Sequence, residues 1–151
     1  MLKELRVKGY RSLRALRLPV GRCTVVVGPN GCGKTNLYNA LRFTAETVQG
    51  RLAESVRAEG GLPSLLWAGE KKSGALIECG LTLGDWEFGF ALRTPMEEES
   101  VFPLDPWIKN ERLCRVGPKG KRTAFMEREG PSVRVRDTNG EWQSYPFEVL
   151  A

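Results

Sequence analysis

Apolar and polar residues alternate with a period of two in the middle of the chain. Every second residue in 77–83 and in 86–92 is apolar, and Gly84 and Asp85 separate the two runs. Such alternation is typical of strands with one buried face, and a Gly-Asp pair suits a two-residue hairpin turn. The pattern therefore predicts an antiparallel β-hairpin over residues 77–92.

Shorter alternating segments follow as far as the end of the chain. Residues 111–116, 122–129 and 132–137 are each expected to form a strand, because glycine- and proline-containing turns separate them. Residues 138–142 (TNGEW) are another expected turn, and we interpret residues 144–151 (SYPFEVLA) as the beginning of a helix.

The N-terminal residues predict a hairpin and then a buried strand. Residues 2–10 and 15–19 alternate loosely, and Gly9 to Ser12 would form the turn between them. Residues 23–27 (CTVVV) form a continuous, β-branched run. A run of this kind is typical of a strand that is buried on both faces, so we expect residues 23–27 in the core sheet.

A helical period replaces the alternation after Thr35. Leu37, Ala40, Leu41 and Ala45 fall at helical spacings, with no glycine or proline before Gly50. Residues 51–59 can add one or two turns of helix. Residues 60–74 are expected to be a loop with a short apolar cluster at its centre, in residues 65–67.

Length and composition are those of a single globular domain. The chain has 151 residues, of which 41% are hydrophobic and 27% charged. No apolar run approaches the roughly 20 residues of a membrane helix, and charges are scattered through the N-terminus, so we expect a cytoplasmic protein. The four cysteines are far apart and the chain has no histidine, which argues against a zinc site and against Ser-His or Cys-His catalysis.

Charge is distributed unevenly along the chain. The net charge is +5, and the segment Lys109–Arg136 holds nine Lys or Arg residues against three Glu. This basic segment is a candidate for a DNA-facing surface, although a solvated strand face explains the same charges. Glu97, Glu98 and Glu99 form an acidic run, which we interpret as a solvated turn rather than a metal site.

Residues 28–35 (GPNGCGKT) carry the clearest chemistry, because they match the pattern GxxxxGK[ST] at every fixed position. Glycines allow the backbone amides to converge on a phosphate at the positive end of the following helix. Lys34 supplies a charge that reaches the β- and γ-phosphates, and the Thr35 hydroxyl can ligate Mg²⁺. The segment predicts a nucleotide site.

The loop with Asn30 and Asn36 included, GPNGCGKTN, resembles the Walker A loop of SMC/RecF-type ATP-binding-cassette ATPases. The N-terminal hairpin is similar to that of the same family, with Tyr10-Arg11-Ser12 in place of its F-R-S motif. The resemblance implies ATP and Mg²⁺ as cofactors, and Arg11 and Ser12 either lie near the nucleotide or merely form a turn. The implied ATP-binding residues are Asn30, Gly31, Cys32, Gly33, Lys34, Thr35 and Asn36.

The family's remaining motifs are missing from the sequence. No apolar run ends in Asp-Glu as a Walker B strand does, no Ser-Gly-rich signature motif is present, and there is no switch histidine. Without a carboxylate to orient water, the chain alone is expected to bind ATP and barely hydrolyse it. No catalytic residue is therefore identified.

The resulting expectation is an α/β P-loop NTPase fold, specifically an ABC/SMC-head-like N-terminal lobe with an antiparallel β arm and an incomplete core sheet. Residues 1–151 would form one lobe, with the hairpin, P-loop strand and helix in 1–60 and mainly antiparallel strands in 75–145. The expected partners are a second copy or the missing C-terminal ATPase half, joined through exposed apolar surface.

The family resemblance implies ATP-dependent dimerisation and a role in DNA metabolism or anti-phage defence. A non-catalytic nucleotide-binding regulatory module remains an alternative. A small P-loop kinase or GTPase fits less well, because the sequence lacks an N-K-x-D motif and its second half does not alternate strands with helices.

Overall fold

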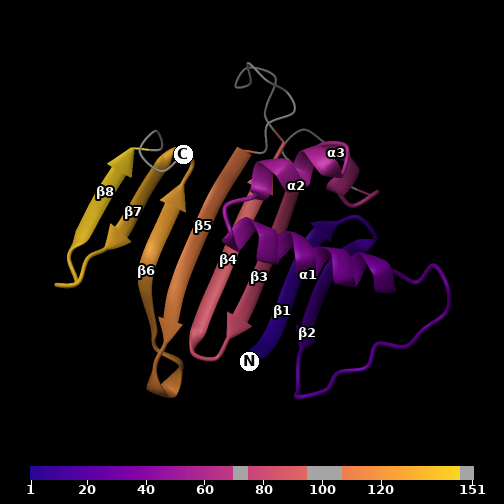
Figure 1. The fold of residues 1–151 in the computed structure, drawn as a ribbon, viewed down its shortest axis with the longest axis horizontal. Helices are drawn as coiled ribbons and strands as arrows, with labels where there is room; N and C mark the ends of the chain where they lie inside the picture. Colours follow the sequence, from indigo (N-terminus) through magenta and orange to yellow (C-terminus); the bar gives the residue numbers. More distant parts are fainter. Residues whose placement is uncertain (70–74, 95–106, 147–151) are drawn as a thin grey trace.

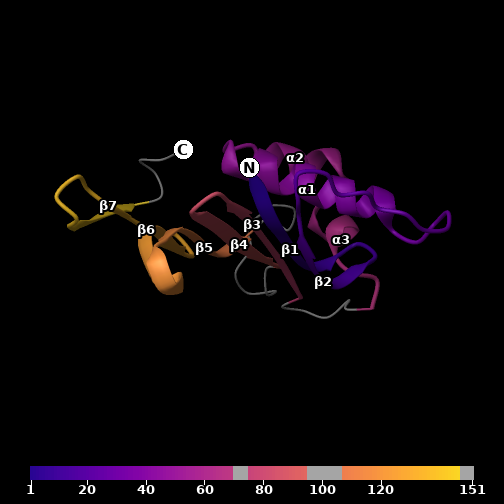
Figure 2. The same cartoon turned by 90° about the horizontal axis from the view of Figure 1, so that it is seen from below.

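The computed structural model describes residues 1–69, 75–94 and 107–146. In these ranges one antiparallel sheet forms the body of the molecule, and the three α-helices lie together on one face of it (Figures 1 and 2). The strands are β1 Leu2–Tyr10, β2 Leu13–Pro19, β3 Leu76–Leu83, β4 Trp86–Arg93, β5 Trp107–Val116, β6 Arg122–Glu129, β7 Ser132–Arg136 and β8 Trp142–Pro146. The helices are α1 Lys34–Val48, α2 Leu52–Ala58, α3 Leu62–Leu65 and the 3₁₀ turn η1 Pro118–Gly120.

The strands follow the order β2-β1-β3-β4-β5-β6-β7-β8 across the sheet, and every pairing is antiparallel. Both predicted hairpins are confirmed: β1 pairs with β2, and β3 pairs with β4 around the Gly84-Asp85 turn. The predicted strands in the last third also form. The N-terminal hairpin joins them through β1, which pairs with β3.

The hydrophobic core lies between the helices and the strands β1, β3 and β4. Phe43 of α1 is 3% exposed and its ring packs between Tyr10 of β1, at 5.7 Å, and Phe90 of β4, at 5.9 Å between centroids. Because alternate strand residues face the helices, most of the inward set from β3 and β4 is buried as the alternation predicted. Leu83 and Trp86, on either side of the turn, are exceptions at 45% and 40% exposed. Strands β5 to β8 extend beyond the part of the sheet that the helices cover (Figure 1).

The helices agree with the periodicity apart from one addition. The predicted helices after Thr35 and in 51–59 are present as α1 and α2. The expected loop 60–74 contains the four-residue helix α3, because Pro63 lies at its first turn and Leu62 and Leu65 are buried against the core. Residues 70–74 lie outside the described ranges.

The prediction of a buried strand at residues 23–27 is wrong for this chain. These residues have no strand structure, and Val25, Val26 and Val27 are 77%, 45% and 84% exposed. A strand is stabilised by its ladder and by side-chain packing on both faces, and no strand in the described residues pairs with this run. The core sheet that the segment was expected to enter is therefore not formed here.

The C-terminal helix is also not found where it was expected. Residues 144–146 belong to strand β8, and the rest of that prediction, residues 147–151, lies outside the described ranges. The acidic run Glu97 to Glu99 is likewise outside them. None of the helices in the described ranges combines the length and apolar character needed to cross a bilayer.

Candidate nucleotide-binding site

The loop that matches GxxxxGK[ST] lies between strand β2 and helix α1 and runs into the first turn of α1 (Figure 1). Gly31 and Gly33 have φ values of 81° and 98°, which are left-handed conformations that glycine adopts without strain. Gly33 is the residue immediately before α1, so the chain turns sharply there before the helix begins. The sequence pattern therefore folds into a compact turn at a helix N-terminus.

The N-terminus of α1 is open to an anion. No side chain of the described residues caps it, and its first turn contains no acidic residue. The first amides of a helix lack partners within the helix, and the helix dipole adds positive potential at the same end. An anion that binds at this turn would therefore be stabilised.

The Lys34 ammonium lies across the loop. Its Nζ donates hydrogen bonds to the carbonyl oxygens of Gly28, at 2.7 Å, and Pro29, at 2.6 Å, and lies 3.8 Å from the Cys32 Sγ. Backbone carbonyls are neutral acceptors, so an anionic oxygen would be the stronger partner for the ammonium. The loop thus holds one positive charge beside the uncapped helix end.

The hairpin turn between β1 and β2 supports the loop from one side. Asn36 Nδ2 donates a hydrogen bond of 2.8 Å to the Ser12 Oγ. A Cβ at Gly33 would come within 2.8 Å of that same oxygen, which is closer than real Cβ atoms approach. The structure therefore brings Ser12, Gly33 and Asn36 together, so that a side chain at position 33 has no room.

A second glycine of the loop, Gly28, is packed against another loop residue. A Cβ at Gly28 would lie 2.8 Å from the Cys32 Sγ, so the backbone of residue 28 and the side chain of residue 32 are in close contact. Asn30 and Thr35 are exposed. Among residues 1–69, 75–94 and 107–146, no group of three or more His, Cys, Asp or Glu side chains is placed to hold a metal ion.

The Arg11 side chain is paired with a residue at the end of α2. Its guanidinium forms an ion pair with Glu59, whose carboxylate also accepts a hydrogen bond of 2.8 Å from Arg42 Nη2. The Arg11 backbone has φ 49° and its amide donates to the Leu65 carbonyl. Sequence reasoning missed Glu59, since nothing in its position along the chain marks it as the partner of two arginines. Arg11 therefore ties the hairpin turn to the helices.

Tyr10, next to Arg11, is fully buried. Burial raises its pKa to about 12, while the neighbouring Arg11 charge acts in the opposite direction. The phenol is therefore neutral at any physiological pH and serves the core rather than the loop.

The basic segment Lys109–Arg136 does not form a single surface. Arg112 and Arg134 flank Glu127 on the sheet face opposite the helices, and Arg112 Nε lies 3.2 Å from its carboxylate. Arg128 instead contacts Glu111 at 3.5 Å on the other face, where burial raises the pKa of Glu111. Strand alternation divides the charges between the two faces.

The family of the chain is shown by comparison with family models. Residues 23–143 match the family described as "AAA domain, putative AbiEii toxin, Type IV TA system". This match covers most of the chain and includes the whole GxxxxGK[ST] loop. The chain belongs to this family of P-loop ATPase domains.

Individual relatives point to the same group of ATPases. The chain is 51% identical over 41 residues to the OLD nuclease of Thermus scotoductus, which covers 27% of the chain and 8% of that protein. It is 25% identical over 157 residues to the chromosome partition protein Smc of Koribacter versatilis, covering 99% of the chain and 12% of the relative. It is also 47% identical over 60 residues to the DNA replication and repair protein RecF of Anaeromyxobacter dehalogenans, covering 37% and 16%.

These matches define the chain as an SMC/RecF-like P-loop ATPase domain, as the motif resemblance implied. The chain spans 8 to 16% of the length of these relatives. No solved structure matches it. The fold is α/β with an antiparallel sheet.

Proposed function

We propose that the chain is an ATP-binding, N-terminal lobe of an SMC/RecF-like ATPase that acts in DNA metabolism or anti-phage defence. The observation that carries this proposal is the Lys34 ammonium, held over the loop beside the uncapped N-terminus of α1. The loop provides a cation, free amide dipoles and a turn without side chains, which together suit a polyphosphate. Membership of an ATPase family and the names of the relatives support the same choice.

The residues present fit the phosphates of ATP. Lys34 would exchange its two carbonyl acceptors for phosphate oxygens, and the backbone from Asn30 to Asn36 would hold the triphosphate. Thr35, exposed at the first turn of α1, would supply one ligand to Mg²⁺. The metal neutralises phosphate charge when bound. Ser12 would position Asn36 at the edge of the site, whereas Arg11 would reach the nucleotide only by leaving Glu59.

Hydrolysis would require residues from elsewhere. A carboxylate must orient the attacking water and complete the metal shell, and the sequence has no strand ending in Asp-Glu. The exposed run Val25 to Val27 has the side chains of a strand but no strand partner in the described residues. We propose that a strand from the C-terminal half of the ATPase, or from a second copy in an ATP-dependent dimer, covers it. The whole chain would then be one ABC-head-like lobe in the cytoplasm.

The test compares nucleotide binding by the chain and by Lys34→Ala, using calorimetry with ATP, GTP and ADP in the presence of Mg²⁺. ATP binding should weaken by about 100-fold or more in Lys34→Ala, because a charge-assisted contact to phosphate is lost beside the helix end. Lys121→Ala, which removes an exposed lysine far along the chain, is the matched control and should bind as the native chain does.

Phosphate release measured on the same samples distinguishes an incomplete ATPase from a non-catalytic regulatory module, the two functions that the sequence left open. Negligible release from the chain alone and turnover after addition of a Walker B-containing half would support an incomplete ATPase. Binding without turnover in both conditions would favour a non-catalytic regulatory module. Equal binding by Lys34→Ala and the native chain would contradict the proposed site.

A further inference from the structure

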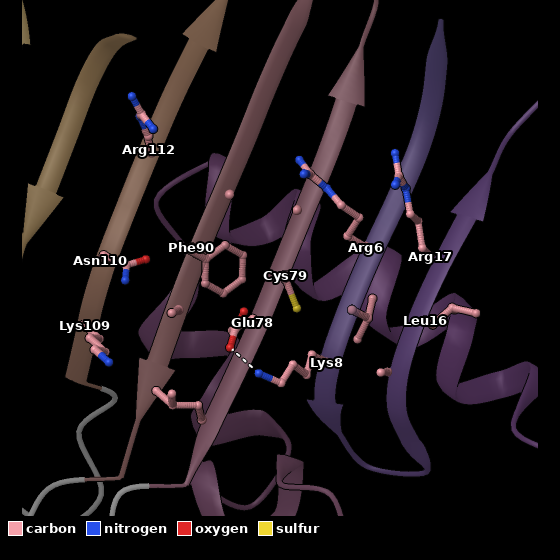
Figure 3. A pocket seen from close by; sticks show the side chains of 16 residues that line it. Arg6, Lys8, Leu16, Arg17, Glu78, Cys79, Phe90, Lys109, Asn110 and Arg112 are labelled. Atoms are coloured by element: carbon pink, nitrogen blue, oxygen red, sulfur yellow. Dashed lines mark hydrogen bonds and ion pairs between the residues drawn. The ribbon is translucent and has the colours of Figure 1, made fainter. Parts of the chain in front are cut away.

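The face of the sheet opposite the helices, called here the open face, is hollowed at its centre (Figure 3). On β1 and β3, Val7 and Cys79 are buried on the helix side, so their neighbours Arg6 and Gly80 belong to the open face. One register row crosses five strands there. It consists of Arg17, Arg6, Gly80, Gly89 and Arg112.

The two adjacent glycines form the floor of the hollow. Residues directly opposite in a sheet project to the same side, so the pair Gly80 and Gly89 leaves that side without side chains between Arg6 and Arg112. The hollow has a volume of about 750 Å³. Its width is three strand spacings, or about 14 Å between the flanking backbones. We call it the glycine hollow.

Positive charge lines both sides of the glycine hollow. Five cationic side chains and one carboxylate, Glu78, contribute to its lining. The cations are Arg6, Lys8, Arg17, Lys109 and Arg112. Figure 3 shows them on β1 and β2 at one side and on β5 at the other, with the floor between them. The lining thus carries an excess of positive charge, with Lys8 paired to Glu78 at 2.8 Å and Arg112 3.2 Å from the Glu127 carboxylate.

Carboxylates pair with several of these cations, and the Glu4 side chain is itself only 17% exposed. Glu4 lies between Arg6, at 3.4 Å, and Arg17, at 2.7 Å, and the two arginine side chains are 40% and 76% exposed. The arginine ends of these ion pairs are exposed and screened by solvent, so the arginines can contact an added anion. Arg6 already extends over the floor, because its guanidinium lies within 3.5 Å of the Cβ position of Gly80.

We propose that the glycine hollow binds the phosphate backbone of a nucleic-acid duplex. Two groups of cations on either side of a glycine floor suit an extended polyanion, and guanidinium groups match phosphate geometry. The one aromatic side chain among the described residues that line the hollow, Phe90, is 3% exposed and packs against Phe43, so it offers no ring for unpaired bases to stack on. The contact is therefore to backbone rather than bases and does not depend on base sequence.

This inference rests on the proposed role in DNA metabolism and assigns a surface that overlaps the basic segment Lys109–Arg136 only at Lys109 and Arg112. The hollow uses Arg6, Lys8 and Arg17 from the N-terminal hairpin, while Lys119 and Lys121 of the segment lie at the η1 turn beyond the end of β5. The two assignments therefore predict that different substitutions weaken binding of the duplex.

The experiment measures binding of a fluorescent duplex of mixed sequence by anisotropy over a range of salt concentrations. Arg6→Gln with Arg112→Gln removes two charges from the hollow and leaves Glu4 with Arg17 and Glu127 with Arg134. Affinity should fall about tenfold or more, and the slope of log affinity against log salt should decrease by about two. Lys119→Gln with Lys121→Gln removes the same charge and should change affinity by no more than about twofold.

A third variant tests the hollow itself without altering charge. Gly89→Gln places a side chain on the floor at a position where a Cβ meets only the Cys79 carbonyl, at 3.5 Å, and where φ is not left-handed. The protein should remain folded, as circular dichroism would verify, while duplex affinity falls several-fold. Unchanged binding by Gly89→Gln, or equal losses in the two double variants, would overturn the proposal.

Two further comparisons identify the occupant. Tighter binding of a single strand of the same sequence, or equal competition by poly-glutamate at matched charge, would overturn the assignment to a duplex. Calorimetry with ATP on the same preparation keeps the two proposals separate. ATP binding without duplex binding would reject the glycine hollow alone, and duplex binding with the expected variant pattern but no ATP binding would reject the proposed nucleotide site alone.

Discussion

Replacement of Phe43 by alanine should be among the most destabilising single changes in the chain. The Phe43 ring is 3% exposed and is the link between α1 and two strands of the sheet, packing on Tyr10 and Phe90. Removal of a buried phenylalanine side chain costs about 3–5 kcal/mol, through lost transfer free energy and the cavity that remains. Of this, each aromatic pair accounts for about 0.5–1.5 kcal/mol.

Phe43→Leu separates the two contributions. It keeps most of the buried apolar area but loses both ring pairs, so its free energy of unfolding should fall by about 1–3 kcal/mol. Tyr38→Ala is the matched control, because Tyr38 is an aromatic residue on the same helix and is 66% exposed. Its effect should remain within about 0.5 kcal/mol.

Urea denaturation followed by far-ultraviolet circular dichroism measures these differences. With a slope of about 2 kcal/mol per molar urea, Phe43→Ala should lower the midpoint by about 1.5–2.5 M. Similar midpoints for Phe43→Ala and Tyr38→Ala would refute the argument, because α1 would then not be held on the sheet through this ring.

Two other measurements concern cysteines and an ion pair. Of the four free thiols, Cys23 and Cys32 are exposed and the other two are buried in strands. A thiol reagent should therefore modify two groups rapidly in the native chain and four after unfolding. Under the proposed function, Mg²⁺-ATP should slow the modification of Cys32 in a Cys23→Ser variant. A hydrogen bond from Arg122 lowers the pKa of Glu87 below its ordinary 4.5. The pairing of the two side chains therefore stabilises the fold at pH values above 4.5, and this stabilisation is lost as the pH falls through the lowered pKa of Glu87 in the folded chain. Arg122→Gln should therefore be less stable than the native chain at neutral pH, with the gap narrowing in denaturation curves recorded below about pH 4; a gap that does not change with pH would assign the effect of Arg122 to packing instead.

The elements that could be predicted from sequence are those specified by neighbouring residues. Strands β3 and β4 follow from strict alternation around a Gly-Asp turn, and α1 follows from apolar spacing after a glycine-rich loop. The GxxxxGK[ST] pattern from Gly28 to Thr35 could also be recognised, because it is contained in one short segment, and the role of these residues in binding nucleotide stays a prediction. Local patterns carry this information without reference to the rest of the fold.

Predictions failed where the outcome depends on a partner distant in the sequence. The run Val25 to Val27 has strand-forming side chains but no neighbouring strand in the described residues, so its composition alone did not determine its structure. The pairing of Arg11 with Glu59 and the alignment of Gly80 with Gly89 depend on tertiary contacts and register. The glycine pair had a signal, since both residues occupy the polar phase of alternating strands, where a side chain is expected.

The strand order also has a consequence for how the chain folds. Every pairing in the described sheet joins strands that are consecutive in sequence, except that between β1 and β3, which brings Arg6 opposite Gly80. Neighbouring hairpins close short loops quickly, whereas this pairing must close a loop that contains all three α-helices, at a greater entropic cost. During synthesis the N-terminal hairpin can join the sheet only after β3 has left the ribosome. The loop that carries Lys34 therefore reaches its native position only after the two parts of the sheet have joined.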